Sequence, residues 1–199
     1  MKRLIFAALA SICMTGAIAQ KSIELGTQLP SDNVKMKDVS GKMVAIKDVK
    51  GKNGTLVVFS CNTCPYVVKN QDRQRAINAY AEEKGLGVII INSNEKMRDG
   101  DDSFEAMQAY AKDQGYKWKY VVDTDSKVAD AFRATRTPEI FLFDKEGKLV
   151  YKGAIDDSPS DASSVKREHL KEAINELVSG KAISLTETKS VGCTIKRKS

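Results

Sequence analysis

The sequence predicts one α/β domain with a central mixed β-sheet flanked by helices, a β-hairpin near the N-terminus and a C-terminal tail. The first observation is the order apolar strand, helix, apolar strand over residues 55–91, which favours a parallel unit with a right-handed crossover. The second is a pair of strand patterns at 139–143 and 148–152, joined by turn residues. A chain of 199 residues is long enough for one such domain with a substantial core.

The first half of the chain supplies the hairpin and the two central strands. Residues 34–39 alternate apolar and polar side chains, a turn over 40–42 follows, and residues 43–46 complete a hairpin with one buried face. Residues 55–59 are nearly all apolar and β-branched, which suits a central strand covered on both faces. Residues 86–91 predict a second buried strand.

Four helices are expected from capping residues and apolar stripes. The first begins at Pro65, because a missing N–H costs nothing in the first turn. Asp102 and Glu105 fit a capping box that opens the second helix. Asp125 caps a short third helix, and residues 165–178 form a last amphipathic helix.

The charge of the chain argues against nucleic acid as a partner. Lysine and arginine number 32 and acidic residues 26, giving a formal net charge of +6. Both signs are mixed along the chain, and no basic block is interleaved with aromatic residues.

The N-terminus predicts export to the periplasm or secretion. Lys2 and Arg3 precede a short apolar core, and Ala17-Ile18-Ala19 is an A-x-A cleavage site, so residues 1–19 form a signal peptide. A membrane anchor is the competing interpretation, which the shortness of the apolar run disfavours. No other segment is long and apolar enough to span a membrane.

Export leaves three cysteines, of which two form a Cys-x-x-Cys pair where a strand gives way to a helix. Cys61 and Cys64 can make and break a disulfide there. A helix N-terminus favours the thiolate, so we expect an exposed Cys61 with a lowered pKa to attack a substrate disulfide. Cys64, one turn on, would resolve the mixed disulfide.

Two other uses of the pair are weighed against redox chemistry. An inert Cys61–Cys64 disulfide would close a very small loop and so stabilise the chain little. A zinc site needs about four N or S ligands, and the chain adds to the pair only a remote Cys193 and a single histidine, His169. Copper fails for the same lack of imidazoles. We therefore expect no metal and no cofactor.

Thr137-Pro138 precedes the predicted strand 139–143. X-Pro bonds are the only ones that are commonly cis, and a cis proline at a strand start is usually a specific feature. A trans proline opening an edge strand is equally compatible with the sequence.

Several motifs together resemble the thioredoxin-fold proteins of the redoxin (AhpC/TSA-like) group. They are VVFSCNTCPY, INSN, DDSFEAM, TPEIFLFDKEGKLVYKGAIDDS and VGCTIK. The resemblance implies a thioredoxin-like domain over residues 20–180 and a tail over 181–199. It implies that Cys61 and Cys64 are the redox pair and that Pro138 is a cis proline facing them. It also implies that the backbone of Thr137 can hydrogen-bond an extended substrate.

The chain departs from those relatives at two points. Many of them have a cysteine where this chain has Arg136. An inward Arg136 would favour the Cys61 thiolate, whereas an outward one would be solvated. If the missing cysteine normally partners the one in the tail, Cys193 is left alone. Cys193 is then either a third redox thiol or an idle thiol, and the idle reading is favoured because a long tail must order to bring it in.

The resulting hypothesis is an exported thiol-disulfide oxidoreductase acting on protein disulfides, with an electron donor or acceptor still to be identified. A thiol peroxidase of the peroxiredoxin-like type is the first alternative. Its P-x-x-x-T-x-x-C setting is absent, since position 57 is Val57 and position 54 is Gly54. A non-catalytic binding module with a static disulfide is the second.

Overall fold

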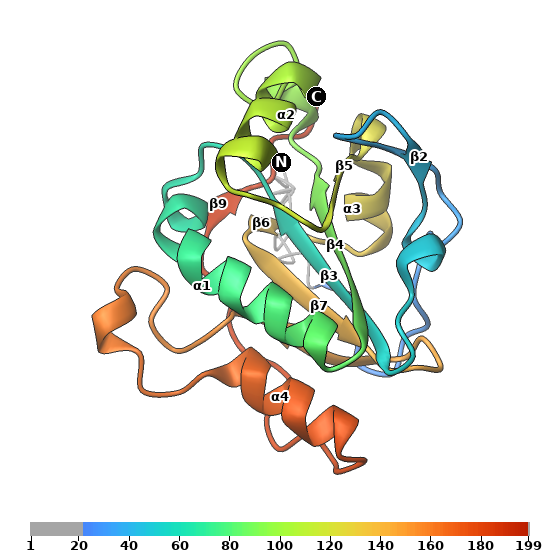
Figure 1. Ribbon diagram of the computed structural model, residues 1–199, viewed down its shortest axis with the longest axis vertical. Coiled ribbons are helices and arrows are strands. Elements are labelled where there is room, and N and C mark those ends of the chain that lie inside the picture. The colour runs from blue at the N-terminus through green and yellow to red at the C-terminus, as the bar shows by residue number, and fades with distance from the viewer. Residues whose placement is uncertain (1–21, 199) are drawn as a thin grey trace, which may run out of the picture.

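A computed structural model of the chain describes residues 22–198, and it contains a seven-stranded mixed sheet (Figure 1). The strand order is β2-β1-β5-β4-β3-β7-β8. The strands are β1 (Met36–Asp38), β2 (Met43–Val44), β3 (Gly54–Ser60), β4 (Leu86–Asn92), β5 (Lys119–Val122), β7 (Glu139–Phe143) and β8 (Leu149–Gly153). Two further strands, β6 (Arg136–Thr137) and β9 (Cys193–Thr194), form a separate antiparallel pair.

The centre of the sheet is parallel and its edges are antiparallel. β3 pairs in parallel with β4, and β4 with β5, whereas β7 lies antiparallel on the other side of β3. Every residue of β3 is buried. The predicted crossover unit, the two hairpins and the mixed sheet are therefore confirmed.

Two apolar clusters lie on opposite faces of the sheet because successive side chains of β3 point to opposite sides. Leu56 and Val58 join the cluster that includes side chains from the helices α1 (Pro65–Glu83), α2 (Phe104–Asp113) and α4 (His169–Val178). Val57 and Phe59 join the other cluster, with side chains from the short helix α3 (Lys127–Ala131). Figure 1 shows α1 and α4 running side by side on their face of the sheet.

Three helix starts differ from the predicted ones. Ser103 is the N-cap of α2 and accepts from the N–H of Ala106, because the carboxylate of Asp102 is used elsewhere. Asp123, not Asp125, caps α3 by accepting from two of its backbone N–H groups. The last α-helix begins at His169, whereas the predicted one began at residue 165. The 3-10 helices are Ile46–Val49, Glu95–Met97, Thr124–Ser126 and Ala162–Ser164.

The tail has more structure than its composition suggested. β9 pairs with β6 in the register Thr137 to Cys193 and Arg136 to Thr194. Ile195 is buried in the cluster on the α3 face. The described part of the segment 181–199 is therefore packed against the domain, because β9 pairs with β6 and Ile195 is buried.

The predicted signal peptide, residues 1–19, lies outside the described residues. Between residues 22 and 198, the structure contains no helix with the length and apolar character needed to cross a membrane.

Candidate active site

The two cysteines of the Cys-x-x-Cys motif lie where β3 meets α1. β3 ends at Ser60, Cys61 follows, and Cys64 is the N-cap residue of the helix that Pro65 opens. Proline at the first helical position has a φ angle already suited to a helix, which favours the turn that brings the two cysteines close together. The predicted strand-to-helix setting of the motif is thus present.

The Thr137–Pro138 peptide is cis and lies against both cysteines. Cys61 Sγ is 3.4 Å from the hydroxyl oxygen of Thr137, and Cys64 Sγ is 3.2 Å from its carbonyl oxygen. Thr137 is fully buried. The loop reaches this position because β7 pairs with β3, placing Glu139 opposite Phe59.

Cys64 forms a disulfide with Cys193 across 129 residues of chain, with the two Cα atoms 6.0 Å apart. Cys61 is the free cysteine among residues 22–198. The expectation of an unpaired Cys193 thiol on the tail is wrong in this structure, because β9 orders the tail beside the motif and Cys193 is bonded to Cys64. Cys61 and Cys64 still pack in one small cluster with Cys193 against it.

Burial corrects the expectation of an exposed, acidic Cys61. The side chains of Cys61 and Cys64 are only 2% and 4% exposed. Desolvation raises the pKa of Cys61 above its ordinary value, and the charge of Asp102 raises it further. The Thr137 hydroxyl and the N–H groups of Cys64 and Thr63 lower that pKa, as a helix N-terminus should. Burial outweighs these hydrogen bonds.

Asp102 is a fully buried carboxylate that holds the Cys-x-x-Cys loop in place. It accepts from the backbone N–H of Asn62 at 2.9 Å and from the side-chain amide of Asn92 at 2.7 Å. Its other oxygen accepts from the amide of Asn94 at 2.8 Å. Charge-assisted hydrogen bonds of this kind offset the cost of burying a carboxylate.

Tyr120 completes this network between the strand ends and the motif. Its hydroxyl donates to the Asn62 side chain at 2.8 Å and accepts from Asn92 at 2.9 Å. Motif analysis did not assign Asn62, Asn92, Asn94 and Tyr120 to the site. The signal in the sequence was a run of polar residues, 92–95, directly after a buried strand.

Arg136 faces the tail rather than the thiols. Its side chain is exposed and donates to the carbonyl of Gly192 at 3.2 Å. The inward arrangement considered for Arg136 is therefore wrong, and the residue instead contacts the segment that carries Cys193.

No group of three or more His, Cys, Asp or Glu side chains in the described range 22–198 is arranged to hold a metal ion. His169 begins α4, on an element outside the cysteine cluster.

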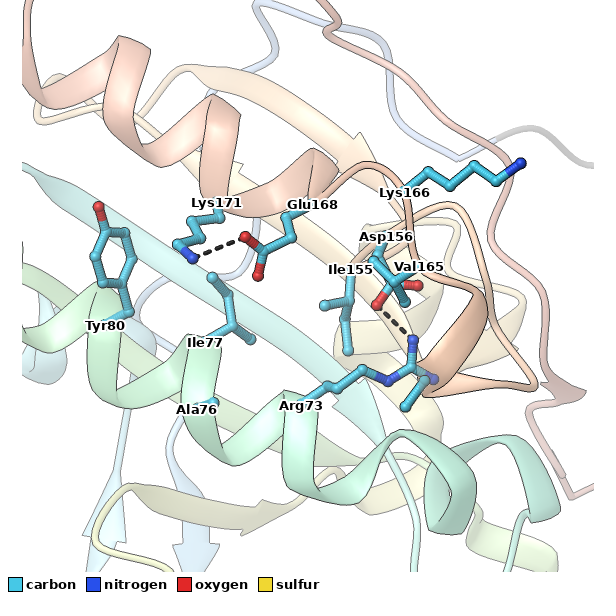
Figure 2. Close-up of a pocket in the computed structure, with 11 residues that line it drawn as sticks. Arg73, Ala76, Ile77, Tyr80, Ile155, Asp156, Val165, Lys166, Glu168 and Lys171 are labelled. Atoms are coloured by element: carbon cyan, nitrogen blue, oxygen red, sulfur yellow. Dashed lines mark hydrogen bonds and ion pairs between the residues drawn. The ribbon is translucent and has the colours of Figure 1, made fainter.

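A cavity on the α1 side of the sheet is separate from the cysteines. It has a volume of about 540 Å³ and lies between α1 and the segment from Ile155 to Lys171 (Figure 2). Arg73 forms an ion pair with Asp156 at one end, and Lys171 pairs with Glu168 at the other. These two pairs join four of the charged residues that line the cavity, and the fifth, Lys166, points away from both pairs.

Comparisons with known proteins show the family and the fold of the chain. The Redoxin family model matches residues 24–168. Thiol-disulfide oxidoreductase ResA of Bacillus subtilis strain 168 is 31% identical over 137 residues, which cover 66% of this chain and 68% of that protein. A crystal structure of an uncharacterized conserved protein from Geobacillus kaustophilus has a TM-score of 0.82 at 32% identity, over 91% of this chain and 98% of that one. The thioredoxin domain of a thiol-disulfide oxidoreductase from Bacteroides vulgatus has a TM-score of 0.56 at 24% identity, over 67% of this chain and 90% of that one, which shows the fold alone.

Fold and site together define the class: this protein is a thioredoxin-fold oxidoreductase. The chain belongs to the Redoxin family, alongside relatives that are thiol-disulfide oxidoreductases. The resemblance drawn from its motifs is confirmed.

Proposed function

We propose that this protein exchanges thiols and disulfides with protein substrates through Cys61 and Cys64, with Cys61 as nucleophile and Cys64 as resolving residue. The observation that carries the proposal is the convergence of both sulfur atoms on Thr137. One lies 3.4 Å from its hydroxyl and the other 3.2 Å from its carbonyl. Thr137 and Pro138 then form the substrate-binding loop.

The reaction proceeds in two exchanges. The Cys61 thiolate attacks one sulfur of a substrate disulfide, forms a mixed disulfide and releases the other substrate sulfur as a thiolate. The Cys64 thiolate then attacks Cys61 Sγ, which forms the Cys61–Cys64 disulfide and releases the second substrate thiol. The substrate gains two electrons and the protein loses two. An external thiol donor restores the reduced pair, and each step also runs in reverse.

The site favours a substrate in extended conformation. The backbone of Thr137 lies beside both sulfur atoms, and Thr137 belongs to β6, a two-residue strand outside the main sheet. Main-chain hydrogen bonds to such an edge bind extended peptides with little regard for side chains. This supports protein thiols and disulfides as the substrate class.

Insulin reduction with a dithiol donor tests the role of each cysteine. We expect Cys61→Ser to lose all turnover, because no nucleophile remains. We expect a Cys64→Ser/Cys193→Ser protein, which keeps Cys61 alone, to accumulate a mixed disulfide with insulin on non-reducing gels. Wild-type protein that shows no turnover although its cysteines are reducible would instead support a non-catalytic binding module. Rapid peroxide consumption that Cys61→Ser abolishes would favour a thiol peroxidase.

We further propose that the protein works outside the cytoplasm after removal of residues 1–19. The positive start, short apolar core and Ala17-Ile18-Ala19 pattern support export. Mass spectrometry of the protein recovered from the periplasm or medium should give Gln20 as the first residue. Recovery only in the cytosol with the N-terminal segment intact would refute export.

A further inference from the structure

We propose that Cys193 is a third redox-active cysteine, and that its bond to Cys64 closes the substrate-binding edge with the protein's own tail. The proposal rests on the function inferred above for Cys61 and Cys64. It adds a cysteine that the Cys-x-x-Cys mechanism does not use, and it gives β9 the role of a tethered occupant of the site.

The tail occupies the edge that an extended substrate requires. β9 pairs antiparallel with β6, and Cys193 lies directly opposite Thr137 in that pairing. Cys193 therefore makes two contacts with the site: it pairs as a strand residue with Thr137 beside the cis proline, and it forms a disulfide with Cys64 of the motif. A substrate in mixed disulfide with the motif would make the same two kinds of contact. Tail and substrate cannot use this edge at the same time.

The tail is held at the edge by contacts on both sides of Cys193. Before it, Gly192 packs so closely on Thr137 that an added Cβ would lie 2.2 Å from the Thr137 carbonyl oxygen. Arg136 also donates to the Gly192 carbonyl at 3.2 Å. After it, the N–H of Ile195 donates to the Thr135 carbonyl at 3.0 Å. Such contacts raise the effective concentration of Cys193 beside Cys64.

The segment beyond β9 connects the tail to the network under the motif. The backbone N–H of Lys196 donates to the side chain of Asn94 at 2.9 Å, and its carbonyl accepts from Lys96 at 2.9 Å. Asn94 in turn donates to Asp102, which accepts from the N–H of Asn62. The closed tail and the Cys-x-x-Cys loop therefore share one chain of hydrogen bonds.

The closing step is an internal exchange that needs no outside oxidant. Starting from the Cys61–Cys64 disulfide, the Cys193 thiolate attacks Cys64 Sγ, forms the Cys64–Cys193 bond and breaks the Cys61–Cys64 bond. Cys61 leaves as a thiolate and takes a proton from solvent, while Cys193 has given one up. The protein holds one disulfide before and after, so no electrons are gained or lost.

Opening reverses this step or uses an external thiol. Cys61 can attack Cys64 Sγ and release Cys193, which frees the tail. Alternatively, a donor thiolate attacks Cys193 Sγ, which is only partly buried, whereas Cys61 and Cys64 are buried. Cys64 then leaves as a thiolate, and a second donor thiol completes the reduction.

Peptide mapping of the oxidised protein gives the first test. Wild-type protein is oxidised with one equivalent of diamide, alkylated with iodoacetamide and digested without reductant. We expect a peptide linking Cys64 to Cys193 and an alkylated Cys61. An exclusive Cys61–Cys64 link with alkylated Cys193 would overturn the proposal.

Single-turnover kinetics give the second test. Each oxidised protein is mixed with excess of a reduced peptide that carries two cysteines, and formation of the peptide disulfide is followed. Unlike a small donor thiol, the peptide needs the β6 edge that the closed tail occupies. Cys193→Ser cannot close, so if the closed form outweighs the open one about tenfold, this variant reacts about tenfold faster than wild type. Gly192→Ala keeps all three cysteines but displaces the tail from Thr137, so we expect an intermediate rate. Thr194→Ala, an exposed position on β9, serves as control and should match wild type.

The outcomes separate this proposal from the proposed function. If Cys193→Ser and Gly192→Ala oxidise the peptide at the wild-type rate, the proposed closed state is refuted. The Cys61–Cys64 mechanism would remain intact. Cys193→Ser that carries a Cys61–Cys64 disulfide but does not oxidise the peptide would refute the mechanism itself. Hydrogen exchange of a peptide spanning residues 190–198 provides a readout without activity. It should be slower in oxidised wild type than in oxidised Gly192→Ala, and equal rates would count against a tail held at the edge.

Discussion

The proposed nucleophile of this site, Cys61, is a thiol held largely away from water. A thiolate in such a position loses hydration that its three hydrogen-bond donors replace only in part. Reactivity at neutral pH then requires the substrate or an opening of the site to supply favourable contacts to the sulfur. Cys61 therefore differs from a free surface thiol, whose fraction of thiolate at a given pH is set by the ordinary pKa of cysteine.

Titration of Cys61 follows from this burial. In the form with the Cys64–Cys193 disulfide, we expect the ultraviolet absorbance of the Cys61 thiolate, taken as the difference from Cys61→Ser, to have its midpoint above pH 9.0, the ordinary pKa of a cysteine. The folded state holds the proton more tightly than the unfolded chain, so the free energy of unfolding should fall as the pH rises past 9.0. A titration complete by neutral pH would contradict the buried arrangement.

Asp102 provides the matched variant for that experiment. Its negative charge raises the pKa of Cys61, so Asp102→Asn should move the titration toward lower pH. Exposed Asp101 is the neighbouring control, because its backbone carbonyl, not its carboxylate, accepts from Asn62. Asp101→Asn should leave the titration unchanged.

At the scale of single elements, the short helix α3 depends on one buried carboxylate. Asp123 accepts from the N–H groups of Val128 and Ala129, both at 2.9 Å, and from the hydroxyl of Ser93 at 2.7 Å. A helix of five residues has few internal hydrogen bonds, so its first turn relies on this cap. The cap also ties α3 to the end of β4, beside the polar network of the site.

Removal of this cap should be costly. Asp123→Ala leaves buried donors without partners, and we expect it to lower the free energy of unfolding by about 2–4 kcal/mol in urea titrations. Asp125→Gly also removes a carboxylate, but from an exposed residue with a positive φ of 56° that glycine tolerates. That control should change stability by about 0.5 kcal/mol or less. Equal losses in the two variants would show that Asp123 does not cap α3.

On the scale of the whole molecule, the tail closes the fold over a long stretch of chain. Cys64 and Cys193 are 129 residues apart. Cys193 lies in the β6–β9 strand pair, and the chain then buries Ile195 just beyond that pair. Ile195 is 3% exposed and packs in the cluster on the α3 face. Through Ile195, the described part of the tail therefore contributes to the core.

Truncation of Ile195 should therefore weaken the whole domain. We expect Ile195→Ala to lower the free energy of unfolding by about 2–5 kcal/mol, the usual range when a buried isoleucine is replaced by alanine. Thr194→Ala, at the exposed neighbouring position, should change it by about 0.5 kcal/mol or less. Thermal and urea unfolding of both variants check this. A loss for Ile195→Ala as small as the control's would mean that the tail adds nothing to the core.

The sequence by itself determined the elements and their order. Residues 55–59 and 86–91 are apolar and β-branched, and Pro65 follows the motif at the place where a helix can begin. These are local properties, because backbone preferences and side-chain alternation act over a few residues. The mixed sheet and the position of the Cys-x-x-Cys pair followed from them, whereas the family was implied by the resemblance of the motifs to redoxin-group proteins.

Only the tertiary structure decided the state of the site. In it, Cys64 is bonded to Cys193 and Arg136 contacts Gly192. Asp102 does not cap a helix but accepts a hydrogen bond from the backbone of Asn62. The tertiary structure also reversed the expected pKa shift of Cys61, because burial depends on everything packed around the sulfur and outweighs the nearby helix N-terminus. Each of these outcomes rests on residues distant in sequence, which no local pattern records.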